Sequence, residues 1–225
     1  MKFSEYARAR KSIRGFTNEP LSKEVVDQII ETGKWSPSSF NSQTWKIYAV
    51  SGDPLDKIRE GNTNNTLAGV PVKREFAYVE DYKNVHRQHQ IDVAVQLFEV
   101  MDIGRHDKEK RMNWMLRGFR QFDAPVCVII TYDKELADSD DTAFDCGAVT
   151  TALVNAAWSR GLGAVINSQG IMQSPVVREH ARIADDQVIM KAVALGWPDD
   201  SFPANAVVSE RKSVEEATSF LGFED

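Results

Sequence analysis

Cysteine and long apolar runs are both scarce in this chain of 225 residues. Its two cysteines, Cys127 and Cys146, form no CxxC pair, so a disulfide framework is excluded and a reducing cytoplasm is the expected compartment. No run approaches the roughly 18 apolar residues that a membrane-spanning helix needs. Residues 1–10 are charged and lack the apolar core of a signal peptide. We therefore expect a cytoplasmic protein with no membrane partner.

Acidic residues outnumber basic ones, with 33 Asp and Glu against 27 Lys and Arg, for a formal charge of −6. A surface of this sign repels polyphosphate, so nucleic acid is not an expected partner. The basic tract near the N-terminus also lacks the interleaved aromatic residues, beyond Phe16, on which unpaired bases stack.

The sequence also lacks the motifs of several reaction classes. It has neither a GxxxxGK[ST] phosphate loop nor a GxSxG nucleophile elbow. Gly161-Leu162-Gly163 lacks the third glycine of a dinucleotide fingerprint and follows a predicted helix, so we interpret it as a helix end and a turn. His86 and His89 have no further ligand at suitable spacing, which favours a solvated helix face over a metal site. An organic cofactor is then the remaining source of reactivity.

Hydrophobic spacing predicts a layered α+β or α/β domain with about four strands interleaved with helices. The predicted strands cover 45–50, 126–132, 164–167 and 188–195. The predicted helices are a short opening helix with Phe3, Tyr6 and Ala7 on one face, then 22–33, 53–58, 91–101, 145–160 and a segment from 174. Small residues on every side of the 145–160 helix allow close backbone approach, which predicts a central helix or a subunit interface.

Two segments depart from this regular pattern. Residues 61–120 mix aromatic and charged side chains, including a turn-like 62–65 and a charged 105–111, and this predicts a lid or rim. The chain after Pro198 has no strong periodicity until Val214, which predicts an arm over 199–225 that leaves the core and docks elsewhere.

Four cations occur within seven residues near the N-terminus, at Arg8, Arg10, Lys11 and Arg14. In an extended segment Arg10, Ser12 and Arg14 would point to one side. Two guanidinium groups that flank a hydroxyl suit a phosphate monoester and a second anionic or carbonyl group. A plain solvated charged face is the competing interpretation of the same residues.

Two motifs then carry a resemblance to a known family. Residues 10–16, RKSIRGF, are followed by residues 35–45, WSPSSFNSQTW, and together they resemble the signature of FMN-dependent nitroreductases. The likeness continues, in the right order, through 124–125, 161–163, 194–198 and 211–216, so it covers nearly the whole chain. The pattern is most similar to the nitrobenzene and nitrobenzoate reductases of that family.

The resemblance implies a three-layer α+β fold with a central, mainly antiparallel sheet. It also implies an intertwined homodimer that holds two FMN molecules in its interface. Residues 1–225 would then form a single FMN-binding domain, in which 61–120 contains the lid-like excursion and the arm at 199–225 wraps the partner.

Residue roles follow from the same resemblance. The FMN phosphate would be bound by Arg10 and Arg211, with Lys11 and Ser12 beside them, and Arg14 would approach the flavin pyrimidine edge near N1 and O2. Family members often have a lysine two positions before the terminal arginine. Ser209 stands there in this chain, which shifts phosphate binding toward the two arginines.

Further positions are expected to line the flavin. Gln169 and Gly170 would pass near N5, and Asn113, with Arg117 as its rival, is the candidate for the N3 and O4 edge. The other subunit's side of the cofactor would be lined by Pro37, Ser38 and Ser39. Thr44 replaces a proline that is common in the family.

The implied reaction is ping-pong, with NADPH or NADH giving a hydride to FMN before the acceptor is reduced. Nitroaromatics would pass through the nitroso compound to the hydroxylamine, and no catalytic side-chain acid or base is expected. Arg14 would stabilise negative charge on the reduced flavin. Phe40 would stack on a small aromatic acceptor or simply pack, and Asn41 would donate to a nitro or carboxylate oxygen or only brace its loop.

Three alternatives stay open at this point. The same fold hosts reductive dehalogenation of iodotyrosine, where Glu, Tyr and Lys side chains of a lid hold a zwitterion, and residues 75–83 contain these types. General quinone or flavin reduction is a second alternative, and flavin binding without turnover is a third. The sequence does not separate NADH from NADPH.

Overall fold

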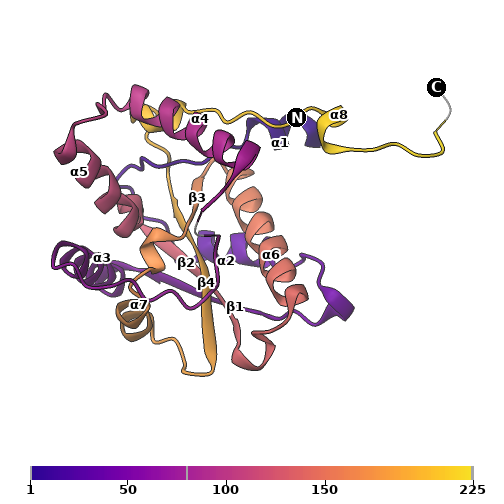
Figure 1. Cartoon of the computed structure of the whole chain (residues 1–225). Helices are drawn as coiled ribbons and strands as arrows, with labels where there is room; N and C mark the ends of the chain where they lie inside the picture. The colour runs from indigo at the N-terminus through magenta and orange to yellow at the C-terminus, as the bar shows by residue number, and fades with distance from the viewer. Residues whose placement is uncertain (1, 80, 224–225) are drawn as a thin grey trace.

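A four-stranded sheet forms the centre of the molecule in the computed structural model, which describes residues 2–79 and 81–223 (Figure 1). Its spatial order is β1-β2-β4-β3, and each neighbouring pair is antiparallel. The strands are β1 (Trp45–Ser51), β2 (Val126–Asp133), β3 (Gly163–Asn167) and β4 (Gln187–Gly196). The four predicted strands and the antiparallel sheet are confirmed.

Helices cover both faces of the sheet and produce the three layers. On one face, α2 (Lys23–Gly33) and α6 (Asp140–Trp158) enclose a core with alternate residues of β2 and β4. On the other face, α3 (Gly52–Leu67) and α7 (Ser174–Ala181) enclose a second core with the remaining residues. The continuous apolar runs of β2 and β4 follow from this burial on both faces.

Local sequence explains where α2 begins and ends. Ser22 caps its start by accepting a hydrogen bond from the backbone N–H of Val25 at 3.4 Å. Val26 and Ile29 form its buried stripe. Gly33 ends the helix where α6 comes close, because a Cβ at that position would lie 2.6 Å from the side chain of Leu153.

The turn predicted at 62–65 is wrong, because these residues lie inside α3, which also continues well past the predicted end at residue 58. Asn62 is fully buried and donates through Nδ2 to the carbonyl oxygens of Phe119 and Gly170, both at 2.9 Å. The Thr63 hydroxyl donates to the carbonyl four residues earlier at 2.7 Å. These contacts outweigh the weak helix propensity of asparagine and threonine.

The excursion between the first and second predicted strands holds two helices that stand above the sheet in Figure 1. α4 (Asn84–Val100) begins earlier than residue 91, where the apolar spacing first becomes visible. α5 (Lys108–Phe119) begins in the charged stretch, because Asp107 accepts a hydrogen bond from the Lys110 N–H at 2.9 Å and caps it. Residue 80 of this excursion lies outside the described residues.

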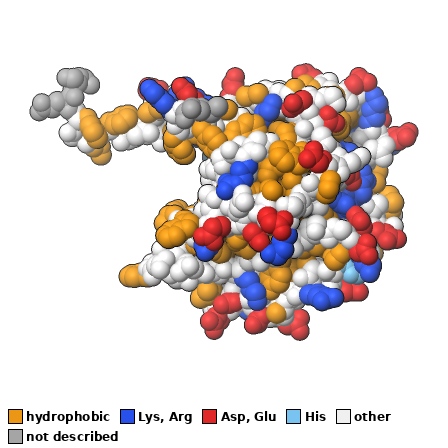
Figure 2. Space-filling view, turned by 180° about the vertical axis from the view of Figure 1, so that it is seen from behind, with side chains coloured by type: hydrophobic (Ala, Val, Ile, Leu, Met, Phe, Trp, Pro, Cys, Tyr) orange, Lys and Arg blue, Asp and Glu red, His pale blue; other side chains and the backbone are white. Residues whose placement is uncertain are grey.

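The C-terminal segment leaves the body later than residue 199. Ala204, Asn205 and Val207 are buried within the same protomer, and a short 3₁₀ turn, η5 (Pro203–Ala206), holds them there. Residues 208–223 are exposed and extend from the body, and α8 (Val214–Ala217) lies where the sequence periodicity returns (Figures 1 and 2). Residues 224–225 of the predicted arm lie outside the described part.

The remaining elements are short. α1 (Phe3–Ala9) is the predicted opening helix and has no buried residue. Four further 3₁₀ turns are η1 (Ser39–Asn41), η2 (Gln121–Asp123), η3 (Lys134–Leu136) and η4 (Gln169–Ile171). Among the helices that the structure describes, none combines the length and apolar character needed to cross a membrane.

Candidate functional site

The basic tract after α1 runs extended along β3. The Ile13 N–H donates to the Ala164 carbonyl at 3.0 Å, and its side chain is buried against Gly163. A Cβ at Gly163 would come within 2.6 Å of Ile13, so only glycine fits at this contact. Because side chains alternate in extended backbone, burial of Ile13 directs Ser12 and Arg14 to the opposite side.

A cavity of about 460 Å³ lies between this tract and the first exposed residues of the C-terminal segment. Four cations contribute to its lining, together with the hydroxyls of Ser12 and Ser209, and no carboxylate does. The cations are Arg8, Arg10, Lys11 and Arg211. The residues that the sequence assigned to a phosphate all line this cavity: Arg10, Lys11, Ser12 and Arg211. Their hydrogen-bond donors suit a phosphate monoester.

Ser209, which replaces a lysine common in the family, takes part in the same cavity. Arg211 donates from Nη1 to the Ser209 hydroxyl at 2.8 Å and to its carbonyl at 2.9 Å. The Ser209 hydroxyl thus orients the Arg211 guanidinium at the cavity wall, whereas a lysine at position 209 would add a further positive charge.

Arg14 is fixed at its backbone while its guanidinium is largely buried. The N–H groups of Arg14 and Gly15 donate to Asn205 Oδ1 at 2.7 and 3.1 Å, and Asn205 Nδ2 donates to the Gly15 carbonyl at 2.8 Å. Burial lowers the pKa of the Arg14 guanidinium from its ordinary value of 12.5, but arginine stays charged in proteins. The site therefore holds a permanent, partly desolvated positive charge.

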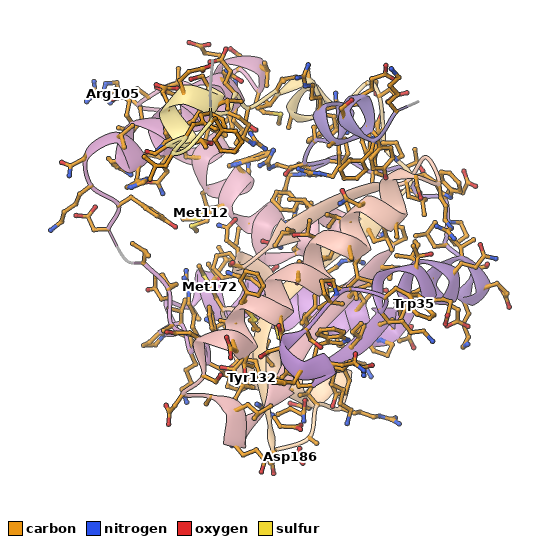
Figure 3. All side chains as sticks on the ribbon, turned by 90° about the vertical axis from the view of Figure 1, so that its right-hand side faces the viewer. Trp35, Arg105, Met112, Tyr132, Met172 and Asp186 are labelled. Atoms are coloured by element: carbon orange, nitrogen blue, oxygen red, sulfur yellow. The ribbon has the colours of Figure 1, made fainter. Side chains whose placement is uncertain are left out.

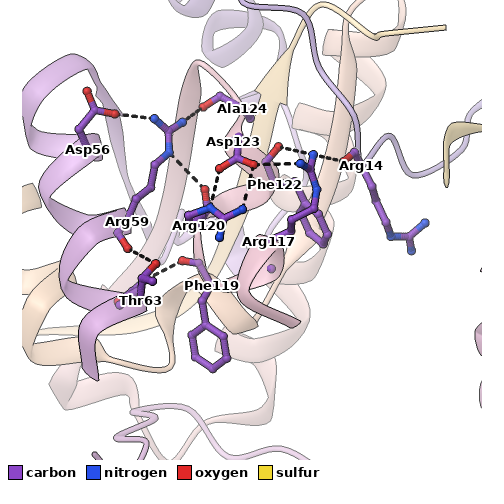
Figure 4. Close-up of polar contacts among 12 residues, drawn as sticks. Arg14, Asp56, Arg59, Thr63, Arg117, Phe119, Arg120, Phe122, Asp123 and Ala124 are labelled. Carbon is purple, nitrogen blue, oxygen red and sulfur yellow. Dashed lines mark hydrogen bonds and ion pairs between the residues drawn. The ribbon is translucent and has the colours of Figure 1, made fainter. Parts of the chain in front are cut away.

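Arg117 supports the tract from the other side. Its Nη2 donates to the Arg14 carbonyl at 3.3 Å, and its Nη1 pairs with Asp123 at 3.1 Å. The same guanidinium lies over the Phe202 ring at 4.6 Å. In Figure 4 the guanidinium of Arg14 points away from this network, and among the described residues it forms no hydrogen bond or ion pair, whereas the Arg117 guanidinium forms both.

Asn113, the other candidate for the flavin N3 and O4 edge, is exposed on α5. It lies one helical turn before Arg117, and the two side chains therefore share one face of the helix.

Two buried asparagines anchor the segment at Gln169 and Gly170. Asn167 donates to the Gly118 carbonyl at 2.8 Å and accepts from the Gln169 N–H at 3.0 Å. Asn62 donates to the Gly170 carbonyl at 2.9 Å. The fit against α5 is close, because a Cβ at Gly118 would lie 2.0 Å from the Gln169 side chain.

The loop containing Pro37, Ser38 and Ser39 lies apart from the basic tract. In the described part of the chain no hydrogen bond joins the two. Figure 3 shows Trp35 at the right of the view, away from Met172, which lies three residues after Gln169. Pro37 instead lines a groove of about 700 Å³ with Trp35 and Phe144. The floor of that groove is made of small α6 residues: Gly147, Ala148, Thr151 and Ala152.

Phe40 and Asn41 project from this loop into solvent. The Phe40 side chain is 103% exposed, and both residues have positive φ values of 49° and 56°. Ser39 connects the loop to α6, because its N–H donates to both carboxylate oxygens of Asp145, at 3.1 and 3.2 Å.

Other chemistries find little support. Burial raises the pKa of the Cys127 thiol to about 12 and that of Cys146 to about 11, so neither is a nucleophile at neutral pH. His86 and His89 are exposed on α4. Within residues 2–79 and 81–223, no group of three His, Cys, Asp or Glu side chains is arranged to hold a metal ion.

The sequence did not identify the residues that position this site. Asn62, Asn167, Asn205 and Asp145 are single buried polar residues whose partners are distant in the chain. Asn167 alone carries a usable signal, since it is a polar residue that ends an apolar strand.

Known proteins resemble this chain over its whole length. A nitrobenzene nitroreductase from Ectopseudomonas oleovorans is 31% identical over 217 residues, which cover 95% of this chain and 94% of that protein. A chloronitrobenzene nitroreductase from Comamonas testosteroni is 30% identical with the same coverage. Among solved structures, an FMN and NADPH-dependent nitroreductase NfnB from Sphigopyxis sp. strain HMH superposes with a TM-score of 0.92 at 23% identity, covering 99% of this chain and all of that one.

The model of the nitroreductase family matches residues 7–197, a span that begins just before the basic tract and ends after β4. This span contains the sheet, its covering helices and all but the C-terminal part of the cationic cavity. The chain belongs to the nitroreductase family.

Proposed function

We propose that this chain is an FMN-dependent NAD(P)H oxidoreductase that reduces small nitroaromatic compounds. The observation that carries the proposal is the convergence of Arg10, Lys11, Ser12 and Arg211 on one cavity without a carboxylate, directly beside the buried charge of Arg14. A phosphate would meet the cations of the cavity, and a polarisable ring attached to that phosphate would meet the charge of Arg14. The relatives named as nitrobenzene and chloronitrobenzene nitroreductases support the same assignment.

The residues present fit FMN. The cationic cavity would hold its phosphate, Arg14 would face the pyrimidine edge, and the anchored Gln169–Gly170 backbone would run past the central ring. When bound, FMN supplies the hydride chemistry, taking two electrons from NADPH or NADH and passing them to the acceptor. Arg14 contributes by placing positive charge where reduction adds negative charge, and the protein then needs no side-chain acid or base.

The overall reaction balances in two steps of two electrons each. A nitroarene, NAD(P)H and a proton give the nitroso compound, NAD(P)⁺ and water, and the nitroso compound, a second NAD(P)H and a proton give the hydroxylamine. Donor and acceptor would occupy one slot in turn, which makes the kinetics ping-pong. Nitrobenzene-like acceptors are favoured, because the exposed Phe40 ring offers a flat apolar wall.

We infer that the active unit is a homodimer. Trp35 and Phe144 are exposed beside the small-residue face of α6, and an apolar surface of this kind is typical of a subunit interface. Phe220, Leu221 and Phe223 add exposed apolar side chains on the extended arm (Figure 2). A partner that covers both surfaces would also bring the Pro37–Asn41 loop of one protomer toward the cationic cavity of the other.

A contact in the lid region weighs against reductive dehalogenation. Glu75 would be one of the acids available to hold a zwitterion, but its carboxylate accepts two hydrogen bonds from Arg178 at 2.7 Å and one from the Ile189 N–H at 2.7 Å. A side chain so engaged is not free to bind an amino-acid substrate.

The visible spectrum of the purified protein tests the proposal. We expect a yellow protein whose flavin absorbance is lost on anaerobic addition of NADPH or NADH and returns when nitrobenzene is added. Benzoquinone and 3-iodotyrosine, added in place of nitrobenzene, test the alternatives. A protein that cannot be loaded with FMN would refute the proposal, and one that binds FMN without oxidising NAD(P)H faster in the presence of acceptor would be a non-catalytic flavin-binding protein.

A further inference from the structure

The loop between α2 and β1 holds an unfavourable backbone conformation. Phe40, Asn41 and Gln43 have φ values of 49°, 56° and 48°, in the left-handed region that favours glycine. Each such residue destabilises the loop, and the cost is highest for a bulky side chain such as Phe40. A conformation of this kind persists only where contacts outside the loop fix it.

Asp145 of α6 supplies those contacts. Its carboxylate is 1% exposed, accepts the Ser39 N–H on both oxygens at 3.1 and 3.2 Å, and accepts the Ser42 hydroxyl on Oδ2 at 3.3 Å. Among the described residues Asp145 forms no ion pair. A buried carboxylate without a cation depends on hydrogen-bond donors, so the helix and the loop stabilise each other.

Hydrogen bonds within the loop also fix the backbone around Phe40. The Ser38 hydroxyl accepts the Gln43 N–H at 3.0 Å, and the Ser42 N–H donates to the Ser39 carbonyl at 2.9 Å. Phe40 therefore lies in a short closed turn whose two anchoring donors, Ser39 and Ser42, flank it. With both ends held on α6, the fully exposed ring is directed away from its own protomer.

We propose that Asp145 is a positioning residue that holds the Ser38–Gln43 turn on α6, so that Phe40 forms a wall of the acceptor slot. The inference rests on the proposed function, since the slot belongs to the flavin that the dimer would hold. Asp145 itself touches neither substrate nor cofactor and acts through Phe40. Its removal should therefore change which acceptors are used, while hydride donation by NAD(P)H continues.

Asp145→Asn tests the inference with little change in size. The amide keeps one acceptor oxygen, so the Ser39 N–H loses one of its two acceptor atoms, and the bonds that remain lose the assistance of a negative charge. Asp140→Asn is the matched control, because it removes the same charge from an exposed position on the same helix. All variants are studied as the purified FMN-loaded protein.

The first measurement is independent of activity. Chymotrypsin cleaves after exposed aromatic residues in mobile backbone, and mass spectrometry identifies the fragments that end at Phe40. We expect the rate of this cleavage to rise about fivefold or more in Asp145→Asn and to stay at the wild-type value in Asp140→Asn. Equal rates in all three proteins would overturn the role of Asp145 in holding the turn.

The second measurement compares acceptors. The ratio of kcat/KM for nitrobenzene to kcat/KM for ferricyanide, which needs no aromatic slot, should fall about fivefold in Asp145→Asn and similarly in Phe40→Ala. The double variant should fall no further, because both changes remove the same wall. Full additivity, or an unchanged ratio in folded Asp145→Asn, would overturn the inference.

A milder variant covers the case in which Asp145→Asn does not fold. Ser42→Ala removes one donor from an exposed position and should move cleavage and acceptor ratio in the same directions by about twofold. If the wild-type protein fails to bind FMN, the proposed function fails, yet the same cleavage measurement on the protein without FMN still decides whether Asp145 holds the turn.

Discussion

Asn205 holds the peptide of Arg14 through its side-chain oxygen, which accepts the N–H of Arg14 at 2.7 Å and that of Gly15 at 3.1 Å. Its amide nitrogen donates to the carbonyls of Gly15 and Asp199, both at 2.8 Å. One buried side chain thus makes four hydrogen bonds and joins the C-terminal segment to the basic tract. The direction of the Arg14 side chain follows from that junction.

Replacing Asn205 should therefore weaken both the fold and the flavin site. Asn205→Ala leaves two buried N–H groups without an acceptor and should lower the free energy of unfolding by about 2–3 kcal/mol. It should also raise the Kd for FMN about tenfold, measured by quenching of flavin fluorescence. Thr131→Val is the control, because it removes a buried hydroxyl whose bond to Gln187 at 2.7 Å lies at the end of β2 remote from Arg14.

The outcome separates two roles for Asn205. A variant that loses stability as Thr131→Val does, and keeps wild-type FMN affinity, would show that Asn205 supports the fold without positioning Arg14.

The charge of Arg14 should matter more to flavin reduction than to the fold. Arg14→Ala should slow reduction of bound FMN by NADPH and weaken FMN binding, because positive charge no longer stabilises the reduced cofactor. Arg14→Lys keeps a positive charge but loses the planar guanidinium, so its reduction rate and FMN affinity should lie between those of the wild type and those of Arg14→Ala. Stopped-flow loss of flavin absorbance measures the rate, and the exposed Arg105→Ala serves as the control. Unchanged rate and affinity in Arg14→Ala would remove this role.

Salt should weaken FMN binding through the cationic cavity. The four cations that line it attract the phosphate dianion, and ions in solution screen that attraction. We expect the Kd for FMN to rise steeply between about 0.05 and 0.5 M NaCl, whereas the Kd for riboflavin, which has no phosphate, should stay nearly constant. Arg211→Ala should reduce the slope for FMN. Equal slopes for FMN and riboflavin would place the phosphate elsewhere.

Both thiols should be unreactive in the folded protein. The pKa values of Cys127 and Cys146, raised by burial to about 12 and about 11, leave almost no thiolate at pH 8. A chromogenic disulfide reagent should therefore label neither thiol of the native protein and both thiols in denaturant. Rapid labelling of the native protein would show that β2 or α6 opens readily.

Sequence patterns predicted those helices and strands whose pattern of buried residues repeats over a few neighbouring positions. The β-branched run at 126–132 and the apolar stripe of α2 predicted their elements because burial imposes a local period. The turn predicted at Asn62 failed because its partners, Phe119 and Gly170, are 57 and 108 positions away. Such pairings leave no periodic trace in the sequence.

The same contrast applies to the site. A compact motif predicted a site at Arg10, Lys11, Ser12 and Arg14, and the resemblance added Arg211 to it. Their supports were not visible, because Asn205 lies 191 positions from Arg14 and Asp145 lies 106 positions from Ser39. Chain topology alone brings such residues together.

Acid should destabilise the fold in part through Glu75. Burial raises the pKa of this carboxyl, but the hydrogen bonds from the Arg178 guanidinium and the Ile189 N–H together lower it further, so it lies below its ordinary value of 4.5. A carboxyl whose pKa is depressed by folding stabilises the native state above the unfolded-state pKa. That stabilisation is lost as the pH falls through the folded-state pKa.

Glu75→Gln should remove this part of the pH dependence. Urea unfolding at several values between about pH 7 and pH 3 should show a smaller loss of stability on acidification in Glu75→Gln than in the wild type. At pH 7 the variant should be less stable, because Arg178 loses its partly buried ion-pair partner. The exposed Glu179→Gln, next to Arg178 on α7, controls for net charge. If Glu75→Gln and wild type lose stability in parallel below pH 4.5, other carboxylates carry the acid sensitivity and the Glu75–Arg178 pair does not.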